Sequence, residues 1–252
     1  MNSLLRSTLF MTILIVVTPP TALVIMLCFW LPHRMRRQLV VPWVALANWL
    51  IEHLLGIRCR LLGAENIPRQ PVVILAKHQS AWETIVLQTV FTDTVFVWKK
   101  ELKWIPFFGW ALAVIPSIQI DRGAGKDALN QLVERGKRRL AQGYSVIVFP
   151  EGTRVAPGRH RRYKAGGAYL AVASRVPVIP VALNSGEAWG RNSFLKRPGT
   201  VTLSIGPAID PAGLSAEEVN NRVEAWIETE MRRISPNLYR NESTRPATSA
   251  AI

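Results

Sequence analysis

A histidine and a glutamate five residues apart are the first candidates for chemistry in this chain. The apolar run at 71–76, typical of a buried strand, is followed by His78, and Glu83 begins the helical pattern that comes next. A carboxylate bonded to one imidazole nitrogen fixes the tautomer and leaves the other nitrogen free as a base. Ser80 and Glu83 also match a capping box, which needs no catalysis. The local pattern therefore supports two interpretations, general base catalysis and helix capping.

The apolar run at 146–149 ends in a turn suited to an anion. Glycine permits a tight or positive-φ turn, which exposes backbone N–H groups beside an arginine guanidinium and so forms a cradle for phosphate. A basic run that includes Lys164 follows and precedes a glycine-rich helix start, which can also bind an anion. A basic run is commonly only a solvated face, but its place here favours a binding site. The residues of the turn are Glu151, Gly152, Thr153 and Arg154.

A second arginine-bearing turn ends the apolar run at 114–120. The letters IQIDR place Arg122 after this run, where its side chain would enter the same crevice as His78, because ligands of α/β sheets bind where strands end. An exposed turn, with Asp121 capping the next helix, explains the same residues without a ligand.

Composition favours a protein that lies against a membrane. The 252 residues include 31 Lys and Arg against 17 Asp and Glu, a net charge of +14, and the mean hydropathy is nevertheless positive. Soluble nucleic-acid binders rarely combine these properties, whereas a protein on an anionic lipid surface does. The two cysteines, Cys28 and Cys59, do not indicate a disulfide framework, and no Cys/His cluster has metal-ligand spacing. We therefore predict neither a metal nor a cofactor.

The N-terminal region contains an uncharged run at 8–31, long enough to cross a bilayer core of about 30 Å as a helix. Pro19 and Pro20 interrupt it near the middle. The run is thus either one kinked spanning helix or two short halves that dip into one leaflet and return. A cleaved signal peptide is less well supported, since no clear cleavage site follows.

The arginines around this run predict its orientation. Three arginines follow it, at 34, 36 and 37, whereas Arg6 alone precedes it. Because positive charge is retained on the cytoplasmic side, we expect an inner-membrane protein whose following domain faces the cytoplasm.

Two apolar segments rich in tryptophan have two interpretations each. Residues 38–57, with Trp43 and Trp49, form either a core helix or an interfacial one. Residues 99–112 mix lysines with Trp104 and other aromatics. They form either a lid packed on the core or a lysine-rimmed surface at the level of the lipid headgroups.

Beyond residue 57, short apolar runs alternate with helix-periodic segments. We therefore predict an α/β fold, with a mixed, largely parallel sheet layered by helices. Strands are expected at 58–63, 71–76, 94–98, 114–120, 144–149, 176–183 and 200–206. Helices are expected at 125–143, 165–175 and 215–234, and the last of these begins with a capping box, Ser215 and Glu218.

Three regions follow from these patterns. Residues 1–57 form a membrane-anchoring helical segment, and 58–235 form the α/β domain. Residues 236–252 lack apolar periodicity and are predicted to be a disordered tail.

Taken in order, four of these stretches resemble the sequence blocks of the glycerolipid acyltransferase family, in particular its bacterial 1-acyl-sn-glycerol-3-phosphate acyltransferases. The first block, a histidine, four residues and an acid, is matched by HQSAWE at 78–83. IQIDR at 118–122 and FPEGTR at 149–154 match the second and third blocks, and VPVIPVAL at 176–183 matches the fourth. Four blocks in the right order, beside an N-terminal membrane segment, make the resemblance specific, and it covers most of 58–210.

The resemblance implies acyl transfer without a covalent enzyme intermediate. His78 would take the proton from the sn-2 hydroxyl of 1-acyl-glycerol-3-phosphate (lysophosphatidic acid), while Glu83 holds the imidazolium. The oxygen would attack the thioester of acyl-CoA or acyl carrier protein to give phosphatidic acid, with backbone N–H groups stabilising the oxyanion. The implied substrate-binding residues are Arg122, Glu151, Gly152, Thr153, Arg154 and Lys164.

Two of these positions need comment. A carboxylate does not bind phosphate directly, so Glu151 is expected to orient Arg122 or Arg154, or to contact glycerol hydroxyls. The family usually has aspartate at the position of Glu83. The extra methylene lengthens the reach to His78, so the helix start or the rotamer must differ slightly, but glutamate can make the same bond.

Several alternatives stay open at this point. The alternative acceptors are lyso-ornithine lipid, another lysophospholipid and glycerol-3-phosphate. A lipase-like hydrolase is disfavoured because no G-x-S-x-G motif occurs. A non-catalytic basic module that binds membrane surfaces or nucleic acid would explain the charge. It would not explain a histidine and two arginine-bearing turns at strand ends, so the expected partners are an acyl donor, a lysolipid and anionic membrane lipids, without nucleic acid.

Overall fold

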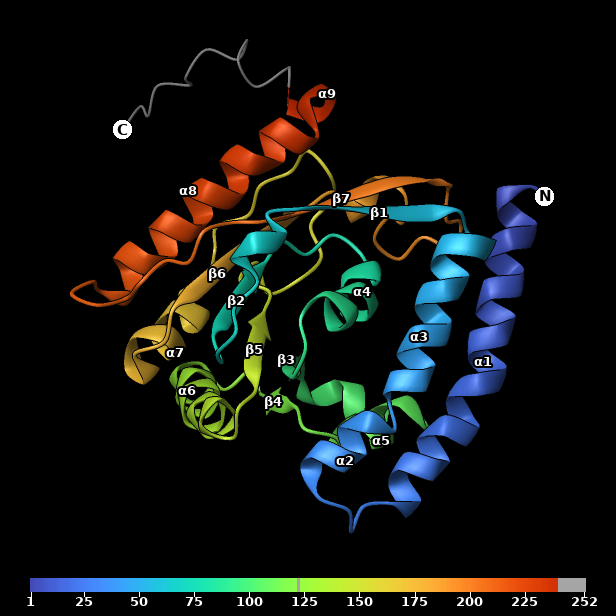
Figure 1. Cartoon of the computed structure of the whole chain (residues 1–252), viewed down its shortest axis with the longest axis horizontal. Coiled ribbons are helices and arrows are strands. Elements are labelled where there is room, and N and C mark those ends of the chain that lie inside the picture. The colour runs from blue at the N-terminus through green and yellow to red at the C-terminus, as the bar shows by residue number, and fades with distance from the viewer. Residues whose placement is uncertain (122, 240–252) are drawn as a thin grey trace.

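The computed structural model describes residues 1–121 and 123–239. Arg122, predicted to bind substrate, and most of the predicted tail, 240–252, lie outside the described residues. The described part of the chain forms one seven-stranded sheet with helices on both faces (Figure 1).

The sheet is mixed and largely parallel, as predicted. Its strand order is β1-β7-β6-β2-β5-β3-β4, and neighbouring strands are parallel except for β6 and β7. All seven predicted strands are present, but the expected strand at 114–120 is reduced to its last three residues. The strands are β1 (Ile57–Leu62), β2 (Val73–Ala76), β3 (Thr94–Lys99), β4 (Ile118–Ile120), β5 (Ser145–Val148), β6 (Val178–Leu183) and β7 (Gly199–Ile205).

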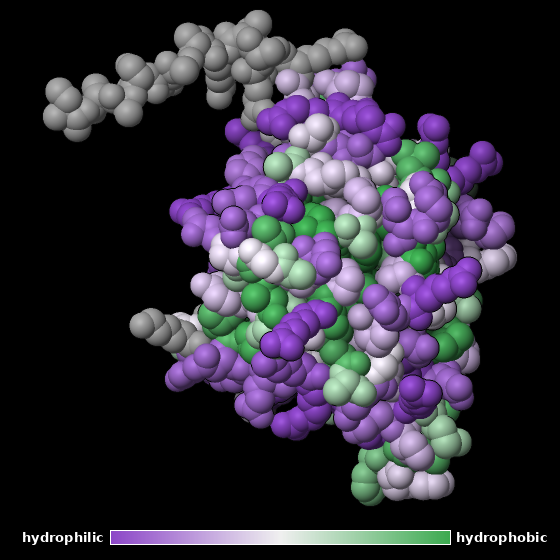
Figure 2. Space-filling model, turned by 60° about the vertical axis from the view of Figure 1, so that its left-hand side comes forward, coloured by the Kyte–Doolittle hydropathy of each residue, from purple (hydrophilic) through white to green (hydrophobic). Residues whose placement is uncertain are grey.

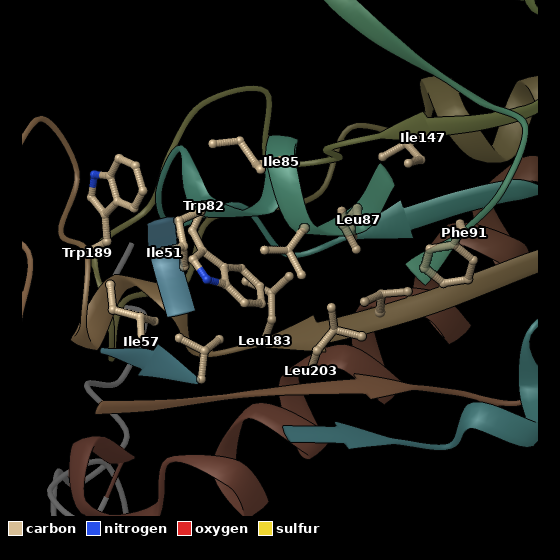
Figure 3. Packing of buried hydrophobic residues seen from close by; sticks show 14 of the residues in the cluster. Ile51, Ile57, Trp82, Ile85, Leu87, Phe91, Ile147, Leu183, Trp189 and Leu203 are labelled. Carbon is tan, nitrogen blue, oxygen red and sulfur yellow. The ribbon is translucent and has the colours of Figure 1, made fainter. Parts of the chain in front are cut away.

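Two hydrophobic cores, one on each face of the sheet, hold the layers together. Strand β2 shows how the sequence builds both, since successive side chains of a strand point to opposite faces. Ile74 belongs to the core under α1, α3 and α4, whereas Val73 and Leu75 belong to the core under α6, α7 and α8. In the first core, the Trp82 indole lies among side chains that include Ile51 (Figure 3).

The helices agree with the predicted pattern where periodicity was strong. The capping box of α8 is confirmed, because Ser215 and Glu218 exchange bonds. Gly136 of α6 faces Leu170 of α7 so closely that a Cβ there would lie 2.5 Å from the leucine, which explains a glycine on the apolar face. The helices are α1 (Ser3–Leu27), α2 (His33–Gln38), α3 (Val41–Trp49), α4 (Trp82–Val90), α5 (Phe108–Val114), α6 (Lys126–Ala141), α7 (Gly166–Ser174), α8 (Ala216–Ile234) and α9 (Pro236–Tyr239), with short helices η1 (Leu50–Leu54), η2 (Ala64–Asn66), η3 (Lys100–Trp104) and η4 (Ser185–Glu187).

The N-terminal helices form an antiparallel pair beside the sheet (Figure 1). Helix α1 continues through Pro19 and Pro20, so the interpretation in which the chain turns back at these prolines is wrong. The Trp43 indole of α3 donates to the Thr18 hydroxyl over 3.1 Å and ties the two helices together. Among the described residues α1 is the helix long and apolar enough to cross a membrane, and only 17% of its most apolar stretch is buried in the protein.

The ambiguous tryptophan-rich segments are both partly exposed. In 38–57, Val44 and Ala47 are buried while Trp49 is 56% exposed, so this region combines core and surface roles. In 99–112, Trp104 is 74% exposed, and the segment is an aromatic surface rather than a lid packed on the core. At the C-terminus, Pro236–Tyr239 form α9 and Tyr239 is buried, so order extends four residues into the region predicted to be disordered.

Candidate active site

The loops that follow β2 and β5 lie side by side, because these strands are parallel neighbours. The carbonyl of His78 in the first loop accepts a hydrogen bond of 2.8 Å from the N–H of Val155 in the second. In return, the N–H of His78 donates to the Glu151 carboxylate over 2.7 Å. The HQSAWE and FPEGTR stretches thus form one structural unit.

His78 and Glu83 face one another within this unit. Nδ1 of His78 lies 3.6 Å from Oε2 of Glu83, too far for a hydrogen bond, and no described residue bonds Nδ1. Catalytic hydrogen bonds often tighten only in the transition-state complex, so this spacing fits a pair that closes when the imidazole gains a proton. Because the nitrogens of an imidazole point in roughly opposite directions, Nε2 is directed away from Glu83.

The Glu83 carboxylate is fully buried and is held by neutral donors. Its Oε1 accepts from the N–H groups of Gln79 and Ser80, at 2.8 and 2.9 Å, and from the Ser185 hydroxyl at 2.5 Å. The Ser80 hydroxyl in turn accepts from the N–H of Trp82 over 3.0 Å, at the start of α4. Helix α4 has Ala81 as its N-cap and no side-chain cap bond, so the capping box predicted for Ser80 and Glu83 is not formed. Glu83 instead holds the loop before α4, and its Oε2, which accepts from the N–H of Ser80 over 3.1 Å, also faces the imidazole.

The imidazole of His78 is fixed by an aromatic neighbour. The ring stacks on Phe149, with centroids 3.9 Å apart and planes inclined by 13°. Phe149 directly follows β5, so the residue that opens the FPEGTR stretch positions the histidine of the other loop. The side chain of His78 is 13% exposed and forms part of the wall of a cavity.

A buried ionic network also holds the loop after β2 in place. The Lys77 ammonium is fully buried and lies 2.9 Å from Glu151 and 2.7 Å from Glu228 of α8. The Tyr163 hydroxyl donates to Glu228 over 2.8 Å. Since Glu151 also binds the His78 N–H, the network connects α8 to the histidine through a lysine and a carboxylate.

Burial and charge shift the pKa values of this network. Burial raises the pKa of Glu151 to about 7, against the opposing effect of Lys77. Burial alone would lower the pKa of Lys77, but Glu151 and Glu228 outweigh it and raise that pKa. Lys77 thus stays charged, and Glu151 is the member of the network that can change protonation near neutral pH.

The cavity beside His78 has a volume of about 480 Å³ and is largely apolar. Its walls come from α1, α4, β3 and α5, and the loops after β2 and β5 close one part of it. Cationic side chains also line it, namely Arg37, Lys99, Arg154 and Arg191.

The predicted substrate-binding residues fall into separate groups. Thr153 and Arg154 line the cavity together with His78. Gly152 adopts a φ of +69°, as the predicted turn requires, and packs near the side chain of Lys164, which is exposed. Glu151 is 0% exposed and bonds Lys77 and the His78 backbone, so its contacts differ from the expected ones to an arginine or a glycerol hydroxyl.

In the IQIDR turn, the acidic residue Asp121 makes its contacts near the protein surface. Asp121 pairs with Lys100 and accepts a 3.0 Å bond from the N–H of Gly123. Helix α6 has no side-chain cap, so the alternative in which Asp121 caps it is wrong.

Sequence reasoning missed several residues around the dyad. Lys77, Glu228 and Ser185 are polar and fully or nearly fully buried, but they are separated along the chain by up to 151 positions. The sequence did indicate a partner for Lys77, because a lysine between a buried strand and a candidate catalytic histidine requires a buried acid. Ser185, two residues beyond the fourth sequence block, gave no such indication.

Known proteins with similar sequences are acyltransferases. The family model described as Acyltransferase matches residues 58–184. A 1-acyl-sn-glycerol-3-phosphate acyltransferase of Pseudomonas aeruginosa is 43% identical over 221 residues, covering 86% of each chain. The human 1-acyl-sn-glycerol-3-phosphate acyltransferase alpha is 31% identical and covers 73% of this chain and 68% of its own.

A solved structure shares the fold over nearly the whole chain. The crystal structure of the 1-acyl-sn-glycerophosphate acyltransferase PlsC from Thermotoga maritima superposes with a TM-score of 0.76 at 25% identity, covering 92% of this chain and 97% of that one. The residues that the family model matches, 58–184, include His78, Glu83 and Arg154. On these grounds the chain belongs to the acyltransferase family.

Proposed function

We propose that this enzyme transfers a fatty acyl group from a thioester to the sn-2 hydroxyl of 1-acyl-glycerol-3-phosphate, giving phosphatidic acid and a free thiol. The observation that carries the proposal is the His78 imidazole, which faces a buried carboxylate on one side and an apolar cavity with cationic residues on the other. The relatives named as 1-acyl-sn-glycerol-3-phosphate acyltransferases support the choice of acceptor.

His78 acts as the general base in this proposal. Its Nε2 takes the hydroxyl proton as the oxygen attacks the thioester carbonyl, and the imidazolium is stabilised by Glu83. When the tetrahedral intermediate collapses, the C–S bond breaks and the thiolate takes the proton back from the imidazolium. Both acyl-CoA and acyl carrier protein can supply this thioester, and acyl transfer of this kind requires no metal or cofactor.

The acceptor phosphate binds at the turn after β5. Thr153 and Arg154 line the cavity beside His78, and the positive φ of Gly152 shapes the turn that presents them. Arg122 and Lys164 complete the proposed binding set. We assign Glu151 a positioning role instead, because its buried carboxylate is occupied by Lys77 and by the N–H of His78.

The apolar part of the cavity suits an acyl chain. Residues of α1, β3 and α5 form its walls, among them Ile25, Phe96 and Leu112. Helix α1, which forms part of this wall, is also the helix that would enter a membrane, since most of its apolar stretch is not buried in the protein. A lipid substrate can therefore approach His78 without leaving an apolar environment.

The proposed location is the cytoplasmic face of the inner membrane. The apolar surface of α1 and the arginines of α2, at its C-terminal end, support this orientation. The α2 arginines and the lysines of 99–103 also suit anionic headgroups. The opposite side of the molecule, where α6 and α8 lie, displays mostly hydrophilic side chains (Figure 2).

The test is an acyl-transfer assay of the purified full-length protein in lipid vesicles. Acyl-CoA and acyl carrier protein thioesters are each offered with 1-acyl-glycerol-3-phosphate, lyso-ornithine lipid or glycerol-3-phosphate. We expect phosphatidic acid as the main product, and we expect H78A and E83Q each to lower turnover on the order of a hundredfold or more. The exposed His53, changed to alanine, is the matched control.

Three results would each contradict part of the proposal. Near-full activity of a folded H78A variant would remove the proposed base. Faster acylation of lyso-ornithine lipid than of 1-acyl-glycerol-3-phosphate would replace the acceptor. Equal losses of folding and activity in E83Q would assign Glu83 only to holding the loop before α4.

A further inference from the structure

Ser185 contacts the carboxylate of the proposed dyad from a distant part of the chain. It begins η4, just after β6, and its side chain is fully buried. The hydroxyl donates to Oε1 of Glu83 over 2.5 Å and accepts from the Ser80 hydroxyl over 3.2 Å. A segment 102 residues away in sequence thus binds the oxygen of Glu83 that does not face the histidine.

These contacts form an ordered chain of hydrogen bonds. The Trp82 N–H donates to the Ser80 hydroxyl, which donates to Ser185, which donates to Glu83. Each bond polarises the next, and the short final bond ends on a charged acceptor, where hydrogen bonds are strongest. The Ser185 hydroxyl, which stabilises the charge of Glu83, is therefore itself polarised by the hydrogen bond that it accepts from Ser80.

The geometry explains how a glutamate fits this site. A glutamate side chain has one more rotatable bond than an aspartate, so its carboxylate needs more external contacts to keep one orientation. Oε1 is fixed by Ser185 and by two backbone N–H groups, and Oε2, which also accepts from the N–H of Ser80 over 3.1 Å, lies 3.6 Å from Nδ1 of His78. Without the hydroxyl, the carboxylate would keep its bonds from the backbone of Gln79 and Ser80 but lose the shortest one, so its orientation toward His78 would be less fixed.

We propose that Ser185 is a positioning residue of the acyl-transfer reaction, which orients Glu83 toward His78 and stabilises its negative charge. This inference rests on the proposed roles of His78 and Glu83. Ser185 is not among the residues that line the cavity, so it acts through Glu83 and not through the substrate.

The S185A variant should fold, because other contacts hold η4 in place. The N–H of Gly186 donates to the Gln79 side chain over 3.0 Å, and the carbonyl of Ser185 accepts from the N–H of Trp189 over 2.8 Å. Neither bond uses the Ser185 hydroxyl. Alanine therefore removes the contact to Glu83 and leaves the backbone of the turn intact.

We expect S185A to lower kcat about tenfold while KM is unchanged, because one charge-assisted hydrogen bond is lost and no substrate contact is affected.

A double-mutant cycle with E83Q separates positioning from a general effect on structure. If Ser185 acts on the charge of Glu83, S185A should lower kcat less than twofold in the E83Q background. S193A is the matched control, since the Ser193 hydroxyl bonds the carbonyl of Leu195 in the same loop and contacts neither member of the dyad. We expect S193A to keep wild-type kinetics, and all variants are compared by melting temperature.

The outcomes distinguish this inference from the proposed function. An inactive H78A with wild-type kinetics in S185A would overturn the role of Ser185 alone. The same tenfold loss of kcat in the wild-type and E83Q backgrounds would also overturn it. An active H78A would overturn the proposed function itself.

Discussion

At the scale of single residues, Glu151 is the group whose charge responds to pH near neutrality. Burial raises its pKa to about 7 from an ordinary value of 4.5, although Lys77 lies 2.9 Å away. The folded protein therefore binds a proton at Glu151 more tightly than the unfolded chain does. The stability that this proton contributes is fully present below pH 4.5 and is lost as the pH rises through 7.

This sign leads to a prediction for E151Q, in which a neutral amide replaces the titrating carboxyl group. Relative to E151Q, the wild type should lose stability between pH 4.5 and 7, by on the order of 3 kcal/mol for a shift of this size. Melting temperatures of the wild type and E151Q, both in one detergent and measured from pH 4.5 to 8, test this prediction. The exposed Glu65, changed to glutamine, should leave the slope as in the wild type. Parallel curves for wild type and E151Q would contradict the raised pKa.

Local patterns revealed the residues that carry the chemistry, but not the contacts that hold them. His78, Glu83 and Arg154 are adjacent to strand ends that an apolar run makes visible. The role of Glu151 was not visible, because its partners Lys77 and Glu228 come from other elements. Its acidic side chain beside Arg154 suggested contact with substrate, whereas burial directs it to the back of the His78 loop.

At the scale of elements, periodicity predicted the sheet and its long helices more reliably than the short connections. The strands of the sheet centre are apolar on both faces, and helices α6 and α8 have one apolar face each, so both signals were strong. The prediction at 114–120 was too long, because Val114 ends α5 and Pro116 cannot donate to a strand ladder. Helices α2 and α5 are six and seven residues long, too short to show a clear period.

The turn after β1 provides a prediction about an element boundary. Gly63 has a φ of +71°, and a Cβ there would lie 2.1 Å from the carbonyl oxygen of Ile205 at the end of β7. Gly213 has a similar φ of +73° but no atom within 4 Å of the Cβ position. Both alanine variants should lose roughly 1–2 kcal/mol from the left-handed backbone, and G63A should lose about 1–3 kcal/mol more from the overlap.

Denaturant unfolding of both variants, with the wild type beside them, measures the difference. G213A is the matched control, since it has the backbone strain without the overlap. Equal destabilisation of G63A and G213A would show that β7 moves to make room, and would contradict the close contact between the two strand ends.

At the scale of the whole molecule, apolar and charged surfaces are distributed unevenly. Helix α5 contacts α1, and the segment before it exposes Trp104, Ile105 and Phe107. Lys99, with Lys100 and Lys103, lies in the same segment. This aromatic surface, residues 99–112, is therefore continuous with the apolar helix α1, whereas helix α7 lies under the opposite face of the sheet (Figure 1).

The position of this surface predicts that it enters the bilayer together with α1. Aromatic side chains flanked by lysines are favoured at the level of the lipid headgroups. An environment-sensitive fluorophore attached at W104C, in a chain whose two native cysteines are replaced, should shift to the blue on vesicles of anionic phospholipid. Nitroxide-labelled lipid chains should quench it. The same probe at Y169C, on α7, should stay in water, although Tyr169 is also 48% exposed. If both probes report water while the protein remains bound to the vesicles, α1 alone holds the enzyme on the membrane, and the lysines of the aromatic surface serve another partner, such as an acidic acyl carrier protein.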